Sequence, residues 1–247
     1  MFAADNELPS RDWLSRAAFL FLKEEELAAA WGRIIASNDD PLINKYYALI
    51  QNDPLTFFVN KNLSSYLKSA RIITEPCAYI FRVDPKFPLP WGANGLVYRT
   101  TAIHESWAVD GYMGDNDAFQ LMIGRGKNLV GYSPELEVIH HSISSLRDWR
   151  SKFKRNFGKH FIAHYGEREL GWAFPADFNR RFLMWLAYAI LPVFSLAHGC
   201  YLAFRDRNPL WLYHPFANLI QVVAYLEVFI SNREARNVVY QVLHRGI

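Results

Sequence analysis

The alternation of apolar and polar residues predicts both helices and strands in the first two thirds of the chain. Apolar residues recur at helical spacing over residues 10–23, 42–51, 54–70, 100–107, 115–125 and 144–164. Shorter apolar or alternating runs, which are typical of strands, cover residues 28–37, 77–83, 95–98 and 137–141. Strands that alternate with helices indicate an α/β fold, and we expect a mixed sheet with flanking helices.

A long uncharged segment follows this region. Residues 182–204 carry no formal charge and lie between Arg180-Arg181 and Arg205-Asp206-Arg207. A helix of this length, rising about 1.5 Å per residue, crosses a hydrocarbon core of roughly 30 Å. The alternative is a buried core helix. Residues 209–230 form a second, mostly apolar run, which is either a second span or an interfacial helix.

These patterns predict two regions, an α/β domain at residues 1–165 and membrane-associated apolar helices at residues 166–247. A hairpin of two spans would leave the domain and the arginine-rich end of the chain on one side. The positive-inside rule assigns that side to the cytoplasm, although the basic loop at 205–207 weakens the signal.

Composition narrows the class of function. The formal net charge is only +3, which argues against a dedicated nucleic-acid-binding protein. Cys77 and Cys200 match no metal-ligand or disulfide spacing. The sequence contains no Gly-rich phosphate loop of the G-x-G-x-x-G or P-loop type.

Two segments carry candidate metal ligands. Asp5-Asn6-Glu7 places two carboxylates in a turn, where they suit a divalent ion on a diphosphate or simply a solvated helix start. His140-His141 ends a predicted strand, so only one of the two side chains can point into a site. An imidazole there is either a ligand for Mn²⁺ or Mg²⁺ or an ordinary structural histidine.

Three further segments suit the binding and activation of a substrate. Asp115-Asn116-Asp117 opens a predicted helix, whose dipole favours ionised carboxylates that either act as a base or cap the helix. Trp91-Gly92-Ala93-Asn94-Gly95 offers a flat aromatic face and close backbone approach, or is an ordinary loop. A basic helix from Arg147 to Lys159 suits a diphosphate or an anionic lipid, or is a solvated face.

The order of these segments resembles the second half of the catalytic domain in glycosyltransferase family 2, which has the GT-A fold. The resemblance covers roughly residues 1–160, and apolar C-terminal segments are similar to those of membrane-attached members. The residues that carry it are Ala3-Ala4-Asp5-Asn6, Trp91-Gly92-Ala93-Asn94-Gly95 with Tyr98-Arg99, Gly114-Asp115-Asn116-Asp117, Gly126, His140, Trp149-Arg150 and Lys154-Arg155.

The resemblance implies a role for each matching residue. Asp115 corresponds to the general base on the acceptor hydroxyl, while Asp5 and His140 correspond to ligands of a Mn²⁺ or Mg²⁺ ion on the donor diphosphate. The acceptor-side residues would be Trp91, Gly92, Asn94, Gly95 and Asp117. The residues near the diphosphate would be Arg150, Lys154 and Arg155.

The function implied is a membrane-associated, inverting transfer of sugar from a nucleotide-diphosphate sugar to a saccharide or polyprenyl-linked acceptor. The sequence departs from the family where Ala3 replaces the first metal Asp and Gly114 replaces the Glu before the base. The Gln-x-x-Arg-Trp of processive synthases and the nucleotide-binding half are also absent from this sequence. We therefore expect a fragment of a longer protein; the alternative is a non-catalytic, membrane-anchored remnant that binds saccharide or lipid.

Overall fold

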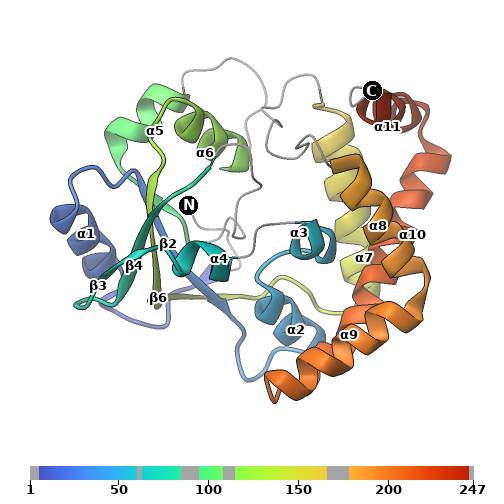
Figure 1. Ribbon diagram of the computed structural model, residues 1–247, viewed down its shortest axis with the longest axis horizontal. Coiled ribbons are helices and arrows are strands. Elements are labelled where there is room, and N and C mark those ends of the chain that lie inside the picture. Colours follow the sequence, from blue (N-terminus) through green and yellow to red (C-terminus); the bar gives the residue numbers. More distant parts are fainter. Residues whose placement is uncertain (1–5, 60–62, 85–94, 108–114, 166–177, 245–247) are drawn as a thin grey trace. The chain divides into compact units, whose positions relative to one another are not determined.

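The computed structural model describes residues 6–59, 63–84, 95–107, 115–165 and 178–244 of the chain (Figure 1). The chain forms two compact units, which are described separately below. The first unit contains residues 6–37 and 63–141, and the second contains residues 38–59, 142–165 and 178–244. Residues 38–59 and 142–165 thus fold with the C-terminal helices in the second unit.

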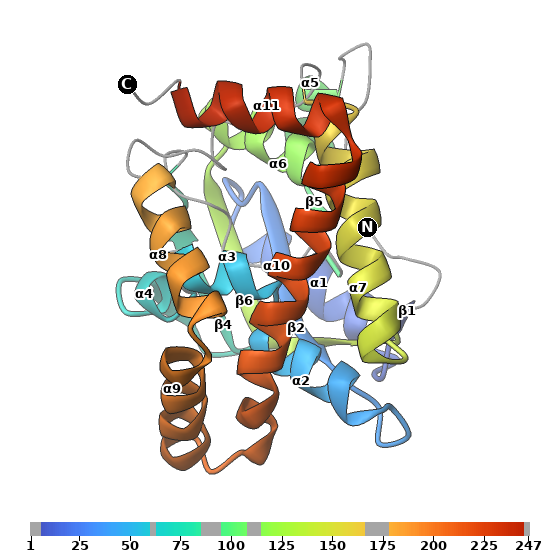
Figure 2. The same ribbon diagram turned by 90° about the vertical axis from the view of Figure 1, so that its right-hand side faces the viewer.

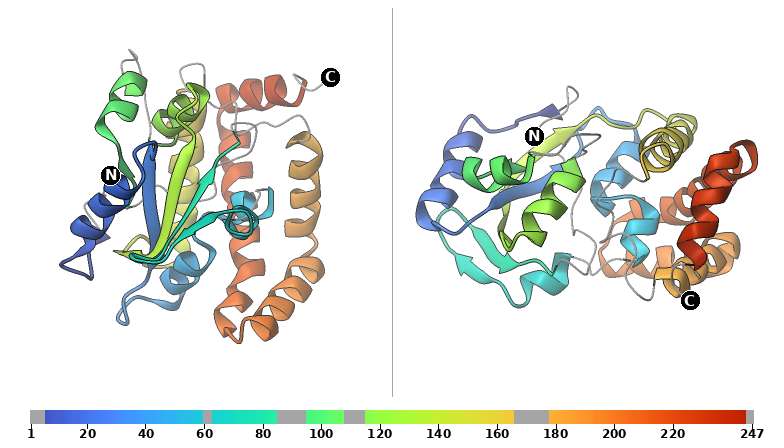
Figure 3. Two further views of the ribbon diagram at one scale, coloured as in Figure 1. Left: turned by 60° about the vertical axis from the view of Figure 1, so that its left-hand side comes forward. Right: turned by 90° about the horizontal axis from the view of Figure 1, so that it is seen from above.

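A six-stranded mixed sheet forms the centre of the first unit and confirms the predicted α/β class. The strand order is β3-β4-β6-β2-β5, and β1 pairs with the far end of β6. Among the described strands, β2 and β6 form the one parallel pair, and Figure 3 shows them side by side. The strands are β1 (Asn6–Glu7), β2 (Ala29–Ile35), β3 (Arg71–Ile73), β4 (Ala78–Arg82), β5 (Val97–Tyr98) and β6 (Leu129–His140).

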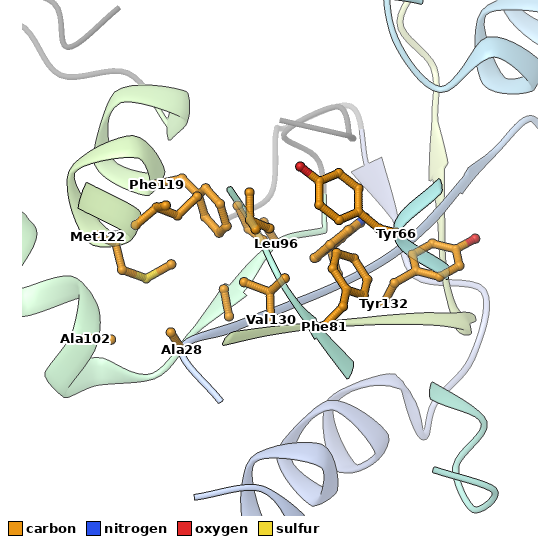
Figure 4. Packing of buried hydrophobic residues seen from close by; sticks show 13 residues of the cluster. Ala28, Tyr66, Phe81, Leu96, Ala102, Phe119, Met122, Val130 and Tyr132 are labelled. Atoms are coloured by element: carbon orange, nitrogen blue, oxygen red, sulfur yellow. The ribbon is translucent and has the colours of Figure 1, made fainter. Parts of the chain in front are cut away.

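Helices cover both faces of this sheet. The helices described in this unit are α1 (Trp13–Lys23), α4 (Leu63–Leu67), α5 (Thr100–Trp107) and α6 (Asp115–Gly124). Side chains of α1 pack with Ala30 and Ile80 on one face. Side chains of α4, α5 and α6 pack with Trp31 and Phe81 on the other face, as Figure 4 shows for the residues that it labels. The alternating residues of β2 and β4 thus supply both cores.

A bulge interrupts the pairing of β6 with β2. Gly32 pairs with Ser133 and Ile34 pairs with Val138, so β6 advances from 133 to 138 while β2 advances only from 32 to 34. The three additional residues in β6 are an odd number, so they exchange the faces to which its alternate residues point. Val130 and Tyr132 accordingly pack on the α6 face, whereas Leu136 and Val138 pack on the α1 face.

Gly32 is required at this bulge by a close backbone approach. A Cβ atom added to Gly32 would lie 1.6 Å from the carbonyl oxygen of Leu136 and 2.3 Å from its carbonyl carbon. Pro134, which has no N–H to donate to a ladder, lies within the same bulge.

The second unit is helical. Its described elements are α2 (Leu42–Ile50), α3 (Pro54–Val59), α7 (Leu146–Arg155), the π-helix η1 (Asn156–Ile162), α8 (Phe178–Ile190), α9 (Pro192–Arg205), the 3-10 helix η3 (Pro209–Tyr213), α10 (His214–Ser231) and α11 (Arg233–His244). Tyr46, Trp149 and Trp211 pack together in its largest core. Figure 2 shows α10 running through the middle of this unit.

The uncharged segment at residues 182–204 is not one continuous helix. It is divided between α8 and α9, which are bent by 88° at a break next to Pro192. Pro192 stands at the start of α9, where its missing N–H costs no intrahelical hydrogen bond. In the part of the chain that the structure describes, no single helix is long and apolar enough to cross a membrane; α8 and α9 meet that test only together.

Most of the other predicted elements are confirmed, with limits shifted by a few residues. The segment predicted as one helix at 54–70 contains the short helices α3 and α4, and β6 begins at Leu129 rather than at residue 137. Gly126 ends α6 as predicted, with a φ of 82°. The N–H groups of Gly126 and Lys127 donate to the carbonyl oxygens of Ile123 and Met122, which is a Schellman motif.

Candidate functional site

The carboxyl end of β6 carries the candidate metal ligand His140. Ile35 of β2 pairs with Ile139, so both parallel strands end at the same edge of the sheet. Open α/β sheets bind ligands at the carboxyl ends of their parallel strands. His140 is 4% exposed and continues the alternation of Leu136 and Val138, which pack on the α1 face.

Strand β1 brings the segment that follows Asp5 to this edge. Asn6 pairs with His140 in an antiparallel register, and Glu7 pairs with Ile139. The side-chain oxygen Oδ1 of Asn6 lies 2.7 Å from Nδ1 of His140. Because an amide oxygen only accepts, Nδ1 of His140 donates this hydrogen bond, and in a neutral ring Nε2 would be the acceptor.

This hydrogen bond suits a histidine that ligates a metal. Metal-ligating histidines usually donate the second ring N–H to a carbonyl or carboxylate, which fixes the tautomer and the ring orientation. Asp5 directly precedes Asn6 in the sequence but lies outside the described residues. No cluster of three or more His, Cys, Asp or Glu side chains able to hold a metal occurs among the described residues. A metal on a diphosphate would take its further oxygen ligands from the phosphates.

The neighbouring His141 differs from His140 in its environment. Its Nε2 atom lies 3.2 Å from Oε1 of Glu7, and the side chain is 36% exposed. His141 follows the last residue of β6 and contacts Glu7, whereas His140 contacts Asn6. His141 is therefore a matched control for any role of His140.

Helix α6 begins with the candidate base. Asp115 is the first residue of this helix, as predicted, and Asp117 in the same turn is 2% exposed. Phe119, Met122 and Ile123 of α6 pack on the sheet face opposite α1. Helix α6 therefore packs on one face of the sheet, and His140 lies on the other face, at the edge where β2 and β6 end.

The acceptor-side loop lies mostly outside the described residues. Trp91, Gly92 and Asn94 belong to that part, so their predicted role stays a prediction. Gly95 is described, with a φ of 73°, and a Cβ added there would lie 2.5 Å from Cγ2 of Val138. The conformation of Gly95 serves close packing against β6, which is a structural need independent of any ligand.

The candidate diphosphate residues belong to the second unit, on α7. Arg150 forms an ion pair with Glu227 of α10, and Nζ of Lys154 lies 2.9 Å from Oε2 of the same carboxylate. Arg155 is exposed at the end of α7. Glu227 therefore neutralises part of the positive charge of α7, the helix that was predicted to bind a diphosphate.

A buried polar network in the second unit was not anticipated from the sequence. The hydroxyl of Tyr46 and Nδ1 of His214 lie 2.6 Å apart, and both side chains are at most 1% exposed. Burial raises the pKa of Tyr46 well above its ordinary value, with a further contribution from Tyr188. Both side chains belong to the helical unit, where this contact joins α2 to α10.

A second group of buried polar side chains joins α3 to α10. The side-chain amide Nε2 of Gln221 donates to Oδ1 of Asp53 at 2.7 Å, and its Oε1 accepts from the N–H of Leu55 at 2.9 Å. Asp53 also accepts from the N–H of Thr56 at 3.1 Å and so caps α3. Isolated polar residues in an apolar run, such as Asn218 and Gln221, were the available signal for such contacts.

Comparison with known proteins adds no family. A scan against models of protein families finds no match, and a search of curated proteins finds no significant relative.

Proposed function

We propose that the protein acts as a membrane-associated, inverting glycosyltransferase. It would transfer a sugar from a nucleotide-diphosphate sugar to a saccharide or polyprenyl-linked acceptor, with its α/β unit facing the cytoplasm. The resemblance of the ordered motifs to glycosyltransferase family 2 supports this proposal, and so does the α/β class with a parallel pair at the candidate edge.

The hydrogen bond between Asn6 and His140 is the observation that carries the proposal. It joins two motifs that lie 134 residues apart in the sequence, at the edge where α/β sheets bind ligands. It also holds the imidazole in the tautomer that a metal ligand needs.

Each residue then has a defined chemical role. Asp115 would accept the proton of the acceptor hydroxyl while the hydroxyl oxygen bonds to the anomeric carbon of the donor sugar. The bond from that carbon to the diphosphate breaks, and the diphosphate leaves with the electron pair. His140 and Asp5 would hold Mn²⁺ or Mg²⁺, which compensates the charge of the leaving diphosphate when bound.

Metal binding gives the first test. His140→Ala should abolish measurable Mn²⁺ binding, detected by electron paramagnetic resonance, whereas His141→Ala should leave it unchanged. Asn6→Ala should weaken binding about 10–100-fold, because the ring loses the partner that orients it. Equal effects of the two histidine substitutions would refute the assignment of His140.

Turnover gives the second test. With a panel of nucleotide sugars, Asp115→Asn should abolish transfer while donor binding, measured by calorimetry, persists. Asp117→Asn serves as the neighbouring control and is expected to affect folding or acceptor affinity more than the chemical step. Unchanged transfer by Asp115→Asn would remove this residue from the role of base.

A second candidate function has one specific observation in its favour. Because Arg150 and Lys154 are paired with Glu227, this carboxylate offsets part of the positive charge that a diphosphate site on the basic helix would use. This pairing favours a non-catalytic membrane-anchored module that binds saccharide or lipid. Such a module would bind saccharide or lipid vesicles without any dependence on a divalent metal or a nucleotide sugar.

A further inference from the structure

The bent helix pair α8–α9 exposes an unusual amount of apolar surface. Large exposed apolar side chains along it include Met184, Leu191, Val193, Phe194, Tyr201 and Phe204. Val193 and Phe194 at the bend are 72% and 59% exposed, and Phe204 is 87% exposed. Single exposed apolar residues are common on soluble proteins, but a continuous series of this kind marks a binding surface.

The packing of α9 explains why so much of it is exposed. Only Ser195, Gly199 and Leu202 are buried, and they recur at helical spacing along one stripe. At Gly199 a Cβ atom would lie 2.8 Å from the carbonyl oxygen of Trp211, so η3 approaches that stripe closely. Ala203 also packs against the core of this unit, whereas Val193, Phe194, Leu196, Tyr201 and Phe204 of α9 are exposed.

The dimensions of the two helices do not suit a span. At about 1.5 Å per residue, the 13 residues of α8 and the 14 residues of α9 each extend roughly 20 Å. A hydrocarbon core is about 30 Å thick. The 88° bend also directs the two axes almost at right angles. Such an element enters a bilayer only partly, as an interfacial helix pair does.

Positive charge lies at both ends of the apolar series. Arg180 precedes it and is exposed, while Arg205 and Arg207 follow it and are exposed as well. Asp206 pairs with Arg205 and offsets one of these charges. Arginines beside an uncharged apolar surface complement the anionic headgroups that cover an acyl layer. A second copy of the chain would instead present the same arginines to each other, which opposes self-association.

We propose that the α8–α9 bend docks into one leaflet of an anionic membrane, so that the chain enters and leaves the membrane on the same side. Val193 and Phe194 lie deepest, and Arg180, Arg205 and Arg207 lie among the headgroups. This inference rests on the membrane association proposed above but is independent of the transfer reaction. It replaces the single span over residues 182–204 with a one-leaflet anchor.

Vesicle flotation of the full chain tests the docking. Vesicles of phosphatidylcholine with added phosphatidylglycerol should bind the protein, and the double variant Val193→Glu/Phe194→Glu should lower the partition coefficient by at least about tenfold. Leu22→Glu is the matched control, because Leu22 is 79% exposed on α1 of the other unit. Its partition coefficient should not change. Circular dichroism checks that each variant is folded.

Charge and topology complete the test. Arg207→Gln should weaken binding to the anionic vesicles about fivefold and leave weak binding to pure phosphatidylcholine unchanged. Single cysteines at Arg180→Cys and Asp206→Cys, with Cys77 and Cys200 replaced by Ser, should both react with an impermeant maleimide from the same side of sealed vesicles. Labelling from opposite sides would establish a span and overturn the proposal.

Other outcomes are also decisive. A wild-type chain that forms a dimer and does not bind vesicles would overturn both the docking and the membrane association. An equal loss of binding in Leu22→Glu would overturn the assignment of the surface to α8–α9. Failure of the proposed transfer reaction, as when the chain transfers no sugar from any donor of the panel, would leave the docking result intact because vesicle binding is measured without any substrate.

Discussion

Replacement of Gly32 by Ala should disrupt the sheet at the bulge in β6. The added Cβ would lie 1.6 Å from the carbonyl oxygen of Leu136 and 2.3 Å from its carbonyl carbon. Non-bonded carbon atoms in contact lie about 3.5–4.0 Å apart. The two strands would therefore have to separate by more than about 1 Å, and the obstructing atoms belong to the backbone, which cannot rotate away as a side chain can.

The expected cost follows from this geometry. Overpacking of a folded interior typically costs about 1–3 kcal/mol, and strand separation also weakens backbone hydrogen bonds that contribute about 0.5–1.5 kcal/mol each. We expect Gly32→Ala to reduce the free energy of unfolding of the first unit by at least about 3 kcal/mol. Gly124→Ala is the matched control, since a Cβ at Gly124 in helix α6 meets no atom within 4 Å.

Two measurements test this expectation. Urea unfolding gives the stability, and Gly124→Ala should stabilise slightly, by about 0.5–1 kcal/mol, because alanine restricts the unfolded chain. Since two compact units need not unfold together, hydrogen exchange of peptides from β2 and β6 localises the effect. If Gly32→Ala retains wild-type stability and wild-type exchange in these strands, the close approach at the bulge is refuted.

Two further predictions concern other constrained positions. Gly95→Ala should destabilise the first unit by about 1–3 kcal/mol in urea unfolding, because its φ of 73° disfavours a Cβ and Val138 lies 2.5 Å from the added atom; an unchanged midpoint would contradict this. Tyr46→Phe should cost about 1–3 kcal/mol, because buried His214 loses its hydrogen-bond partner. Because burial raises the pKa of Tyr46, its protonated hydroxyl stabilises the fold below pH about 10, and this stabilisation is lost as the pH rises above about 10. If the free energy of unfolding of the wild type and of Tyr46→Phe depends on pH in the same way, this reasoning is refuted.

The elements that local signals determine were predictable. Helix α6 has an apolar periodicity, acids in its first turn and Gly126 after its last turn, and the structure contains all three. Ser145 is the N-cap of helix α7, and its side-chain oxygen accepts a hydrogen bond from the N–H of Asp148, as a polar residue before a helical pattern suggests. Such features depend on residues within about one turn of each other, so the sequence alone contains the information.

Features that depend on distant contacts were not predictable in this way. The first half of β6 was not predicted, because Pro134 interrupts its apolar pattern. The bulge opposite Gly32 did have a sequence signal, since a glycine inside a strand often marks a bulge. The pairing of Arg150 and Lys154 with Glu227 joins α7 to α10, and a basic helix looks the same in sequence whether or not a carboxylate meets it. The break between α8 and α9 lies next to Pro192. One continuous helix was predicted there because residues 182–204 carry no formal charge.

The bulge determines which face of the sheet His140 occupies. Because β6 contains three additional residues between its two pairings with β2, Leu136, Val138 and His140 share the α1 face, whereas Val130 and Tyr132 share the other. Without the bulge, His140 would point to the face that α6 covers, and its hydrogen bond to Asn6 would be lost. A residue with no reactive group, Gly32, thereby controls the geometry of the candidate metal ligand. Gly32→Ala should consequently weaken Mn²⁺ binding as well as folding, which a purely local packing defect would not do.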